Sequence, residues 1–192
     1  TIGIQRGAAA AVPASHIRDG QQPLVPQDFL GIQMTGSAVA GDIEHTSIII
    51  AYDDLPGVEG RFTTPMDVMK RAKNLFSNTI TVATGTSGQY TGQVAVNSAQ
   101  DSFKANTDYA LIGYQVVGGA VHAIRFVGPD WGNLGVGGPA LNDTGRSVTS
   151  DWFSRLGMVP IMNSANKALT LIDAVADENG ANPIVDIFWV EL

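Results

Sequence analysis

The chain has 192 residues, of which 15% are charged, and a formal net charge of −7 at pH 7. It contains no cysteine, which excludes disulfides and thiolate metal sites. The acidic balance argues against a strong nucleic-acid-binding face, because such a face needs clustered Lys and Arg. The longest apolar runs, at 46–52 and 184–190, are strand-length and fall well below the roughly 18 residues of a membrane span.

Residues 1–27 predict an extended N-terminal arm. They are rich in Gly, Ala, Pro and Gln and have neither the period of a strand nor that of a helix. Up to residue 18 the arm carries two positive charges, Arg6 and Arg18, and no acid. Such an end either stays disordered or reaches a partner, so both arginines are candidate interface residues. The remaining residues, 28–192, are predicted to form one domain.

The first half of this domain predicts four strands. They lie at 29–34, 45–55, 79–84 and 92–97, and the last two alternate polar and apolar residues. The segment Gly85-Thr-Ser-Gly88 between these two predicts a hairpin connection.

Two short helices are expected to interrupt the strands. Thr64, Pro65 and Asp67 provide a cap, a first-turn proline and an acid at the positive helix end. We expect this helix to run to about residue 76, with one apolar face made of Met69, Ala72, Leu75 and Phe76. A second start at Ser150-Asp151-Trp152 predicts a helix that ends near residue 157.

The second half predicts five more strands. Those at 109–117 and 120–127 flank Gly118-Gly119, which is a strong hairpin signal. Three others are expected at 158–163, 169–175 and 184–192, although 166–175 has helical propensity as well.

A glycine-rich stretch at 128–139 is predicted to form a structured surface loop. Trp131 within it is either an anchor folded back on the core or an exposed contact, and the second interpretation makes it a candidate interface residue. Strands with Gly-, Pro- and Asn-rich turns about every 10 residues favour an antiparallel sandwich or barrel over a wound α/β sheet.

No motif for catalysis or cofactor binding is found in the sequence. There is no nucleophile elbow and no phosphate-binding glycine loop, so the chain is predicted not to be an enzyme and to need no cofactor. The oxygen-rich turns at Asp53-Asp54 and Asp177-Glu178 are weak candidates for a structural calcium site, with a plain turn as the alternative. The histidines at 16, 45 and 122 are too far apart in sequence to suggest a metal site.

The arm, about eight strands, a helix between early strands, a second short helix and a terminal strand resemble the single jelly-roll capsid proteins of tailless icosahedral viruses, including those of bacteria. The resemblance is architectural, covers residues 28–192 and transfers no functional residue. It implies an all-β, antiparallel jelly roll with two short helices and an extended arm. It also implies a structural protein of the virion that self-assembles into pentamers, trimers or hexamers of a shell, with other capsid proteins as further partners.

Two other classes of protein remain open. A non-enzymatic β-sandwich binding module, such as an adhesin or a carbohydrate-binding domain, would need exposed aromatic residues, for which Tyr90, Trp131 and Trp152 are the candidates. An enzyme on a β scaffold is the other class; glycoside hydrolysis would use a pair of carboxylates, and no pair stands out among the 18 acidic residues.

Overall fold

The computed structural model describes residues 38–40, 60–118, 121–133, 135–139, 157–176 and 178–192. The chain divides into two units, Thr1–Glu44 and His45–Leu192, and every described strand and helix belongs to the second. Four predicted features lie outside the described residues: the arm at 1–27, the strands at 29–34 and 45–55, and the helix expected from Ser150.

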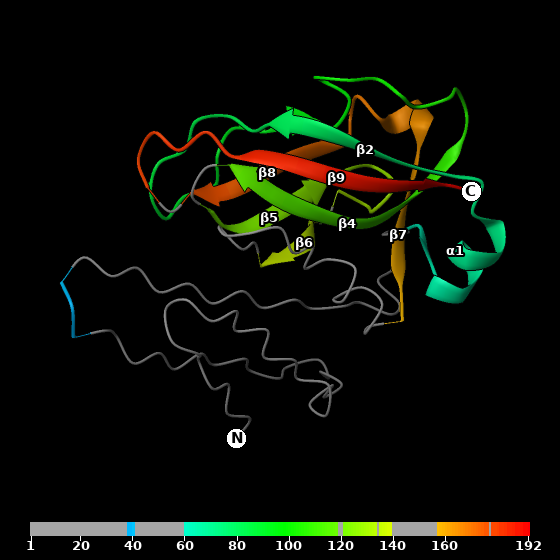
Figure 1. Cartoon of the computed structure of the whole chain (residues 1–192), viewed down its shortest axis with the longest axis horizontal. Coiled ribbons are helices and arrows are strands. Elements are labelled where there is room, and N and C mark those ends of the chain that lie inside the picture. Colours follow the sequence, from blue (N-terminus) through cyan, green and yellow to red (C-terminus); the bar gives the residue numbers. More distant parts are fainter. Residues whose placement is uncertain (1–37, 41–59, 119–120, 134, 140–156, 177) are drawn as a thin grey trace. The chain divides into compact units, whose positions relative to one another are not determined.

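The strands of the described residues form two antiparallel sheets (Figure 1). The first sheet has the order β1-β7-β4-β9-β2, and the second has the order β3-β8-β5-β6. The strands are β1 (Phe62–Thr63), β2 (Asn74–Thr81), β3 (Val94–Ala95), β4 (Asp108–Gly118), β5 (Val121–Val127), β6 (Gly135–Pro139), β7 (Val159–Asn163), β8 (Leu171–Ala176) and β9 (Ile184–Glu191).

This strand order is that of a jelly roll. The pairs β2–β9, β3–β8, β4–β7 and β5–β6 are the successive rungs of one long eight-stranded hairpin. Folding that hairpin over itself sends alternate rungs to opposite sheets, which produces β2-β9-β4-β7 and β3-β8-β5-β6. The short β1 extends the first sheet beside β7. The prediction of an all-β antiparallel jelly roll is therefore confirmed, and one of the two predicted helices lies among the described residues.

The same topology corrects both hairpin predictions. The connection that begins at Gly85 leads from β2 in the first sheet to β3 in the second, so these strands do not pair. Its backbone bonds to another loop instead: Gly85 N–H donates to the Ala181 carbonyl at 2.9 Å, and Gly180 N–H donates to the Gly85 carbonyl at 3.0 Å. β4 and β5, on either side of Gly118-Gly119, also belong to different sheets, because β7 and β9 occupy both edges of β4.

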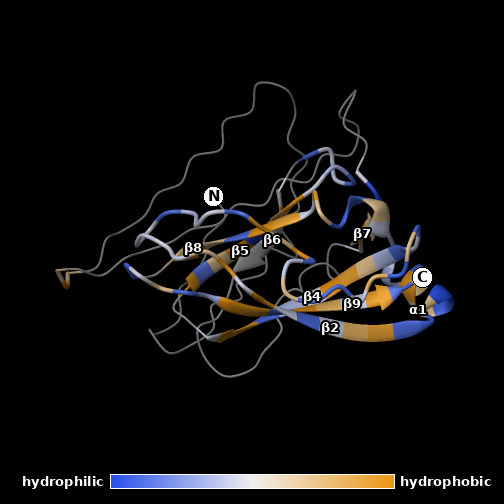
Figure 2. Cartoon of the chain, turned by 90° about the horizontal axis from the view of Figure 1, so that it is seen from above, coloured by the Kyte–Doolittle hydropathy of each residue, from blue (hydrophilic) through white to orange (hydrophobic). Residues whose placement is uncertain are grey.

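The main core lies between the two sheets, and Figure 2 shows hydrophobic residues along the strands of both. Phe103 packs edge-to-face against Phe76, Tyr109 and Trp189, with ring centroids 5.0–5.5 Å apart. A bulge in β4 after Leu111 changes which positions face inward, so that Tyr109 and Tyr114 both lie in this core.

The single α-helix among the described residues, α1 (Pro65–Arg71), starts where the sequence predicts, and a short 3-10 helix, η1 (Ser164–Asn166), follows β7. The Thr64 hydroxyl accepts a hydrogen bond from the Asp67 N–H at 3.1 Å, which caps the helix. The prediction that it continues to residue 76 was wrong, because β2 begins at Asn74. Phe76 packs against the core rings from this strand, so tertiary packing overrides the helical spacing of its neighbours.

The last three strand predictions are confirmed as β7, β8 and β9, which excludes the helical alternative at 166–175.

The glycine-rich stretch at 128–139 is a loop only in its first half, because its second half forms β6. Gly137 permits this pairing: a Cβ there would lie 2.1 Å from the Ile124 carbonyl oxygen, so only glycine lets β6 approach β5. Within the described ranges, no helix is long and apolar enough to cross a membrane.

Candidate assembly surface

α1 packs on the outward side of the first sheet through one buried residue, Val68. Along β9, Trp189 faces the main core whereas the next residue, Val190, belongs to a second apolar cluster with Val68. The other members of this second cluster come from β4, β7 and the end of the described chain: Ala110, Val159, Ile161 and Leu192, with Ile112 packed beside them. The helix therefore covers one end of the first sheet (Figure 1).

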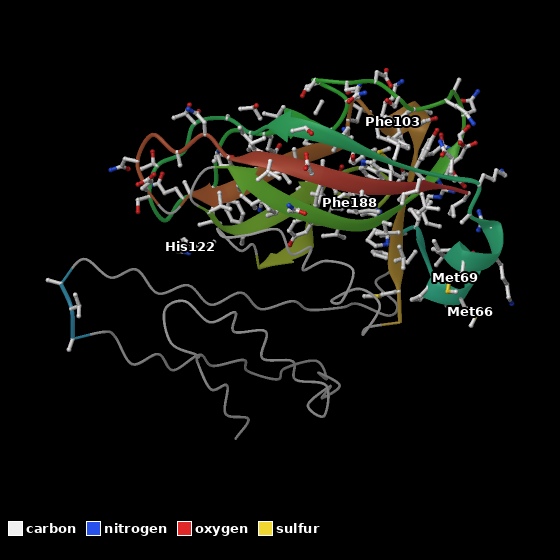
Figure 3. All side chains as sticks on the ribbon, in the orientation of Figure 1. Met66, Met69, Phe103, His122 and Phe188 are labelled. Atoms are coloured by element: carbon white, nitrogen blue, oxygen red, sulfur yellow. The ribbon has the colours of Figure 1, made fainter. Side chains whose placement is uncertain are left out.

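The rest of the helix presents large apolar side chains to solvent. Met66 is 59% exposed and Met69 is 75% exposed, and both lie on α1 at one end of the sandwich (Figure 3). Leu75, 62% exposed, pairs across strands with Val190 and so lies on the same side of the sheet as α1. We call Met66, Met69, Lys70 and Leu75 the α1 surface.

The chain that leads into α1 is fixed to three other segments. The Arg61 guanidinium donates to both Asp108 oxygens at 2.7 and 3.0 Å and lies 3.5 Å from an Asp130 oxygen. Asp130 in turn accepts from the Asn163 N–H at 2.9 Å. The hydrogen bonds from Arg61 lower the pKa of Asp108, with a smaller contribution from Asn163, so Asp108 holds its charge in acid better than an exposed aspartate. β1 is thereby fastened to β4, β7 and the loop at 128–133.

The chain that leaves α1 is fixed as well. Lys73 donates its backbone N–H to the Glu191 carbonyl at 2.9 Å and its Nζ to the Leu192 carbonyl at 2.7 Å. In the first turn of the helix, Asp67 accepts from the hydroxyl of Thr63 in β1 at 2.6 Å and from Arg71 at 2.9 Å. The Thr63 hydrogen bond, followed by that of Arg71, lowers the pKa of Asp67. Because both ends of α1 are held in place, its backbone loses little conformational entropy when its exposed side chains bind a partner.

The structure separates the helix face that the sequence predicted. Met69 was expected on one face with Ala72, Leu75 and Phe76, but the helix ends at Arg71 and Val68 is its buried residue. Phe76 contacts the core, whereas Met69 and Leu75 remain exposed. The sequence therefore identified the helix but not its exposed surface, because apolar residues stand at positions 66, 68 and 69 and give no clear amphipathic direction.

Most of the site residues suggested by the sequence lie outside the described residues, namely Arg6, Arg18, Asp53, Asp54 and Asp177. Glu178 is exposed in a turn. Among the residues that the structure describes, no group of three or more His, Cys, Asp or Glu side chains could hold a metal ion. The calcium interpretation of the turns at 53–54 and 177–178 thus stays a prediction.

Trp131 is a loop anchor, which corrects its candidacy as an interface residue. Its side chain is 1% exposed, and its indole Nε1–H donates to the Ile161 carbonyl at 3.1 Å. The turn at 128–133 folds the ring into the main core, so its apolar surface is buried there and its one hydrogen-bond donor, the indole N–H, has a partner.

A second surface feature lies on the other sheet. Arg125 and Asp173 stand opposite each other on β5 and β8 and form two hydrogen bonds of 2.6 and 3.0 Å. Gln93 donates to the buried Asp173 carboxylate at 3.2 Å, and Tyr90 stacks on the guanidinium at 3.9 Å from ring centroid to carbon. The hydrogen bond to Asp173 raises the pKa of Arg125. Tyr90 is 51% exposed, so the cluster places an accessible aromatic ring beside charged groups.

The sequence marks Tyr90 as a candidate exposed aromatic residue but gives no signal for its partners. Arg125 and Asp173 are 48 residues apart and meet only through the β5–β8 pairing. No family model, curated protein or solved structure matches the chain.

Proposed function

We propose that the protein is a structural subunit that self-assembles into a viral capsid shell, and that it acts in the virion with copies of itself and with other capsid proteins. The observation that carries this proposal is the α1 surface. It places three large apolar side chains, each more than half exposed, on a backbone fastened at both ends. Groups of exposed apolar side chains on a rigid backbone are typical of protein interfaces.

The size of this surface favours repeated contacts over a single strong pair. Burying a large apolar side chain contributes about 2 kcal/mol, so Met66, Met69 and Leu75 together contribute about 6 kcal/mol at most. Association of two proteins costs about 4–15 kcal/mol in lost freedom of motion. One such contact is therefore weak, and it gains strength when many copies close around symmetry axes, as they do in a shell.

The jelly roll supports the same proposal. Its strands run between two ends at which loops are grouped, and lateral contacts through such loops leave both sheets intact. This fold also occurs in lectins and in enzymes, so it is compatible with a capsid subunit without requiring one.

Negative-stain electron microscopy and light scattering of the purified full chain test this function. We expect particles, rings or capsomers, and a second sample that lacks residues 1–27 should assemble less well while keeping its β-rich circular dichroism spectrum. A full chain that remains a monomer up to millimolar concentration would overturn the proposal. Unimpaired assembly of the truncated chain would overturn only the role of the arm.

One observation favours a second candidate, a carbohydrate-binding or adhesin module. Tyr90 offers an aromatic face next to Arg125, Asp173 and Gln93, and sugars bind to aromatic faces flanked by hydrogen-bonding groups. A glycan array decides this case, with Tyr90→Ala as the variant and Val117→Thr, another exposed apolar residue, as its control. Binding of the full chain that only Tyr90→Ala abolishes would favour the module, and no binding to any glycan would exclude it.

A further inference from the structure

The α1 surface has a charge opposite to that of the rest of the chain. Lys70 is the one charged member of the α1 surface, and the segment that carries this surface, residues 64–75, contains three basic residues and one acid, a charge of +2. The whole chain carries −7, so the remaining residues carry −9. The one acid, Asp67, is already paired with Arg71 at 2.9 Å. Lys70 is exposed and stands four residues after Met66, on the same side of the helix.

We propose that the α1 surface binds an acidic surface of a second copy of this chain in a head-to-tail contact. The inference rests on the proposed function, because it names the partner of the surface through which the shell would assemble. Charge complementarity selects this occupant: a positively charged, apolar surface on a strongly acidic chain finds its complement on another copy of that chain.

Two other occupants are disfavoured by the same charges. A symmetric contact would bring two α1 surfaces together, each with an exposed Lys70 and a local charge of +2, and like charges repel across an interface. The N-terminal arm is also a poor match, because its first 18 residues carry only the positive charges of Arg6 and Arg18.

The apolar part of the surface suits a repeated contact. Methionine side chains are flexible and polarisable, so Met66 and Met69 can adapt to the slightly different angles between neighbours around different symmetry axes. A head-to-tail contact does not terminate at two copies, and it closes into rings where the rotation allows.

Sedimentation velocity of the full chain at about 50 mM and about 500 mM NaCl tests the proposal, because salt screens the charged part of the contact. Two variants probe the surface, the double substitution Met66→Ser/Met69→Ser and the single substitution Lys70→Gln. The three substituted positions and the two control positions are all exposed, so the variants should fold, and circular dichroism checks that they do.

Each variant has a matched control on the opposite end of the sandwich from α1. Val117→Thr makes an exposed apolar residue polar near the end of β4. Gln89→Glu changes the net charge by the same −1 as Lys70→Gln and lies in the loop between β2 and β3. Both controls should assemble as the unchanged chain does.

We expect the double variant to weaken self-association by up to about 1,000-fold, as the loss of two apolar contacts implies. Lys70→Gln should weaken it about fivefold at the lower salt concentration and less than about twofold at the higher one. A chain that never assembles refutes the proposed function itself. Assembly that the α1 variants leave unchanged, that the controls impair equally, or that stops at a symmetric dimer refutes the head-to-tail contact while leaving self-assembly in place.

Discussion

Asn78 connects the two sheets inside the core, and its replacement should destabilise the fold strongly. It is a buried residue of β2, and its side-chain oxygen accepts from the Trp189 indole N–H at 2.8 Å. Its side-chain nitrogen donates to the carbonyl of Val96, the residue that follows β3. One amide thus joins the first sheet to the second.

The cost of removing this amide follows from the two groups that it satisfies. In Asn78→Ala, the Trp189 N–H and the Val96 carbonyl lose their partner in the core, at about 1–3 kcal/mol each. We therefore expect a loss of about 4 kcal/mol, a large part of the 5–15 kcal/mol that stabilises a typical domain. The neighbouring Ser77 is exposed, so Ser77→Ala should change stability by less than about 0.5 kcal/mol and serves as the control.

Urea unfolding followed by circular dichroism measures both variants, at protein concentrations low enough that assembly does not contribute. The midpoint of Asn78→Ala should fall clearly below that of the unchanged chain and of Ser77→Ala. Equal midpoints for all three proteins would refute the argument that this amide holds the sheets together.

Three other predictions concern single interactions. Arg125→Met should cost about 3 kcal/mol in urea unfolding, because it leaves the buried Asp173 carboxylate without its cation, and a second substitution, Asp173→Leu, should restore most of the loss; a double variant no more stable than the single one would contradict this. Because the hydrogen bonds from Arg61 lower the pKa of Asp108, that carboxylate stabilises the fold above its unfolded pKa of about 3.9, and the stability is lost as pH falls through the folded value. Asp108→Asn should therefore be less stable at pH 7 and should lose less stability than the unchanged chain between about pH 5 and about pH 2, whereas parallel pH profiles would exclude this role. Gly137→Ala should lower stability by about 2 kcal/mol, since its new methyl group meets the backbone of β5, and an unchanged thermal midpoint would show that β6 can move away.

The sequence predicted those elements whose signal is local. The terminal strand β9, with its run of β-branched and aromatic residues, and the capped start of α1 are both where the pattern placed them. The end of α1 and the start of β2 could not be read in this way, because Leu75 and Phe76 continue the helical spacing while Asn74–Thr81 pairs along its whole length with β9. That pairing joins residues more than 100 positions apart in the chain.

Connections and surfaces were harder to predict than strands. A glycine pair between two strands fits a hairpin and also fits a crossover between two sheets. At Gly118 the connection is a crossover, because β4 belongs to the first sheet and β5 to the second. The exposure of Met69 and the burial of Trp131 depend on how α1 and the 128–133 turn pack on distant strands. The Arg125–Asp173 pair depends on the register between β5 and β8.

The most direct test of the central claim is the mass of the purified full chain in solution, measured by light scattering after size exclusion over a wide concentration range. We expect species of many copies that form with increasing concentration and are lost in Met66→Ser/Met69→Ser. A single species of 20.1 kDa at every concentration would contradict it.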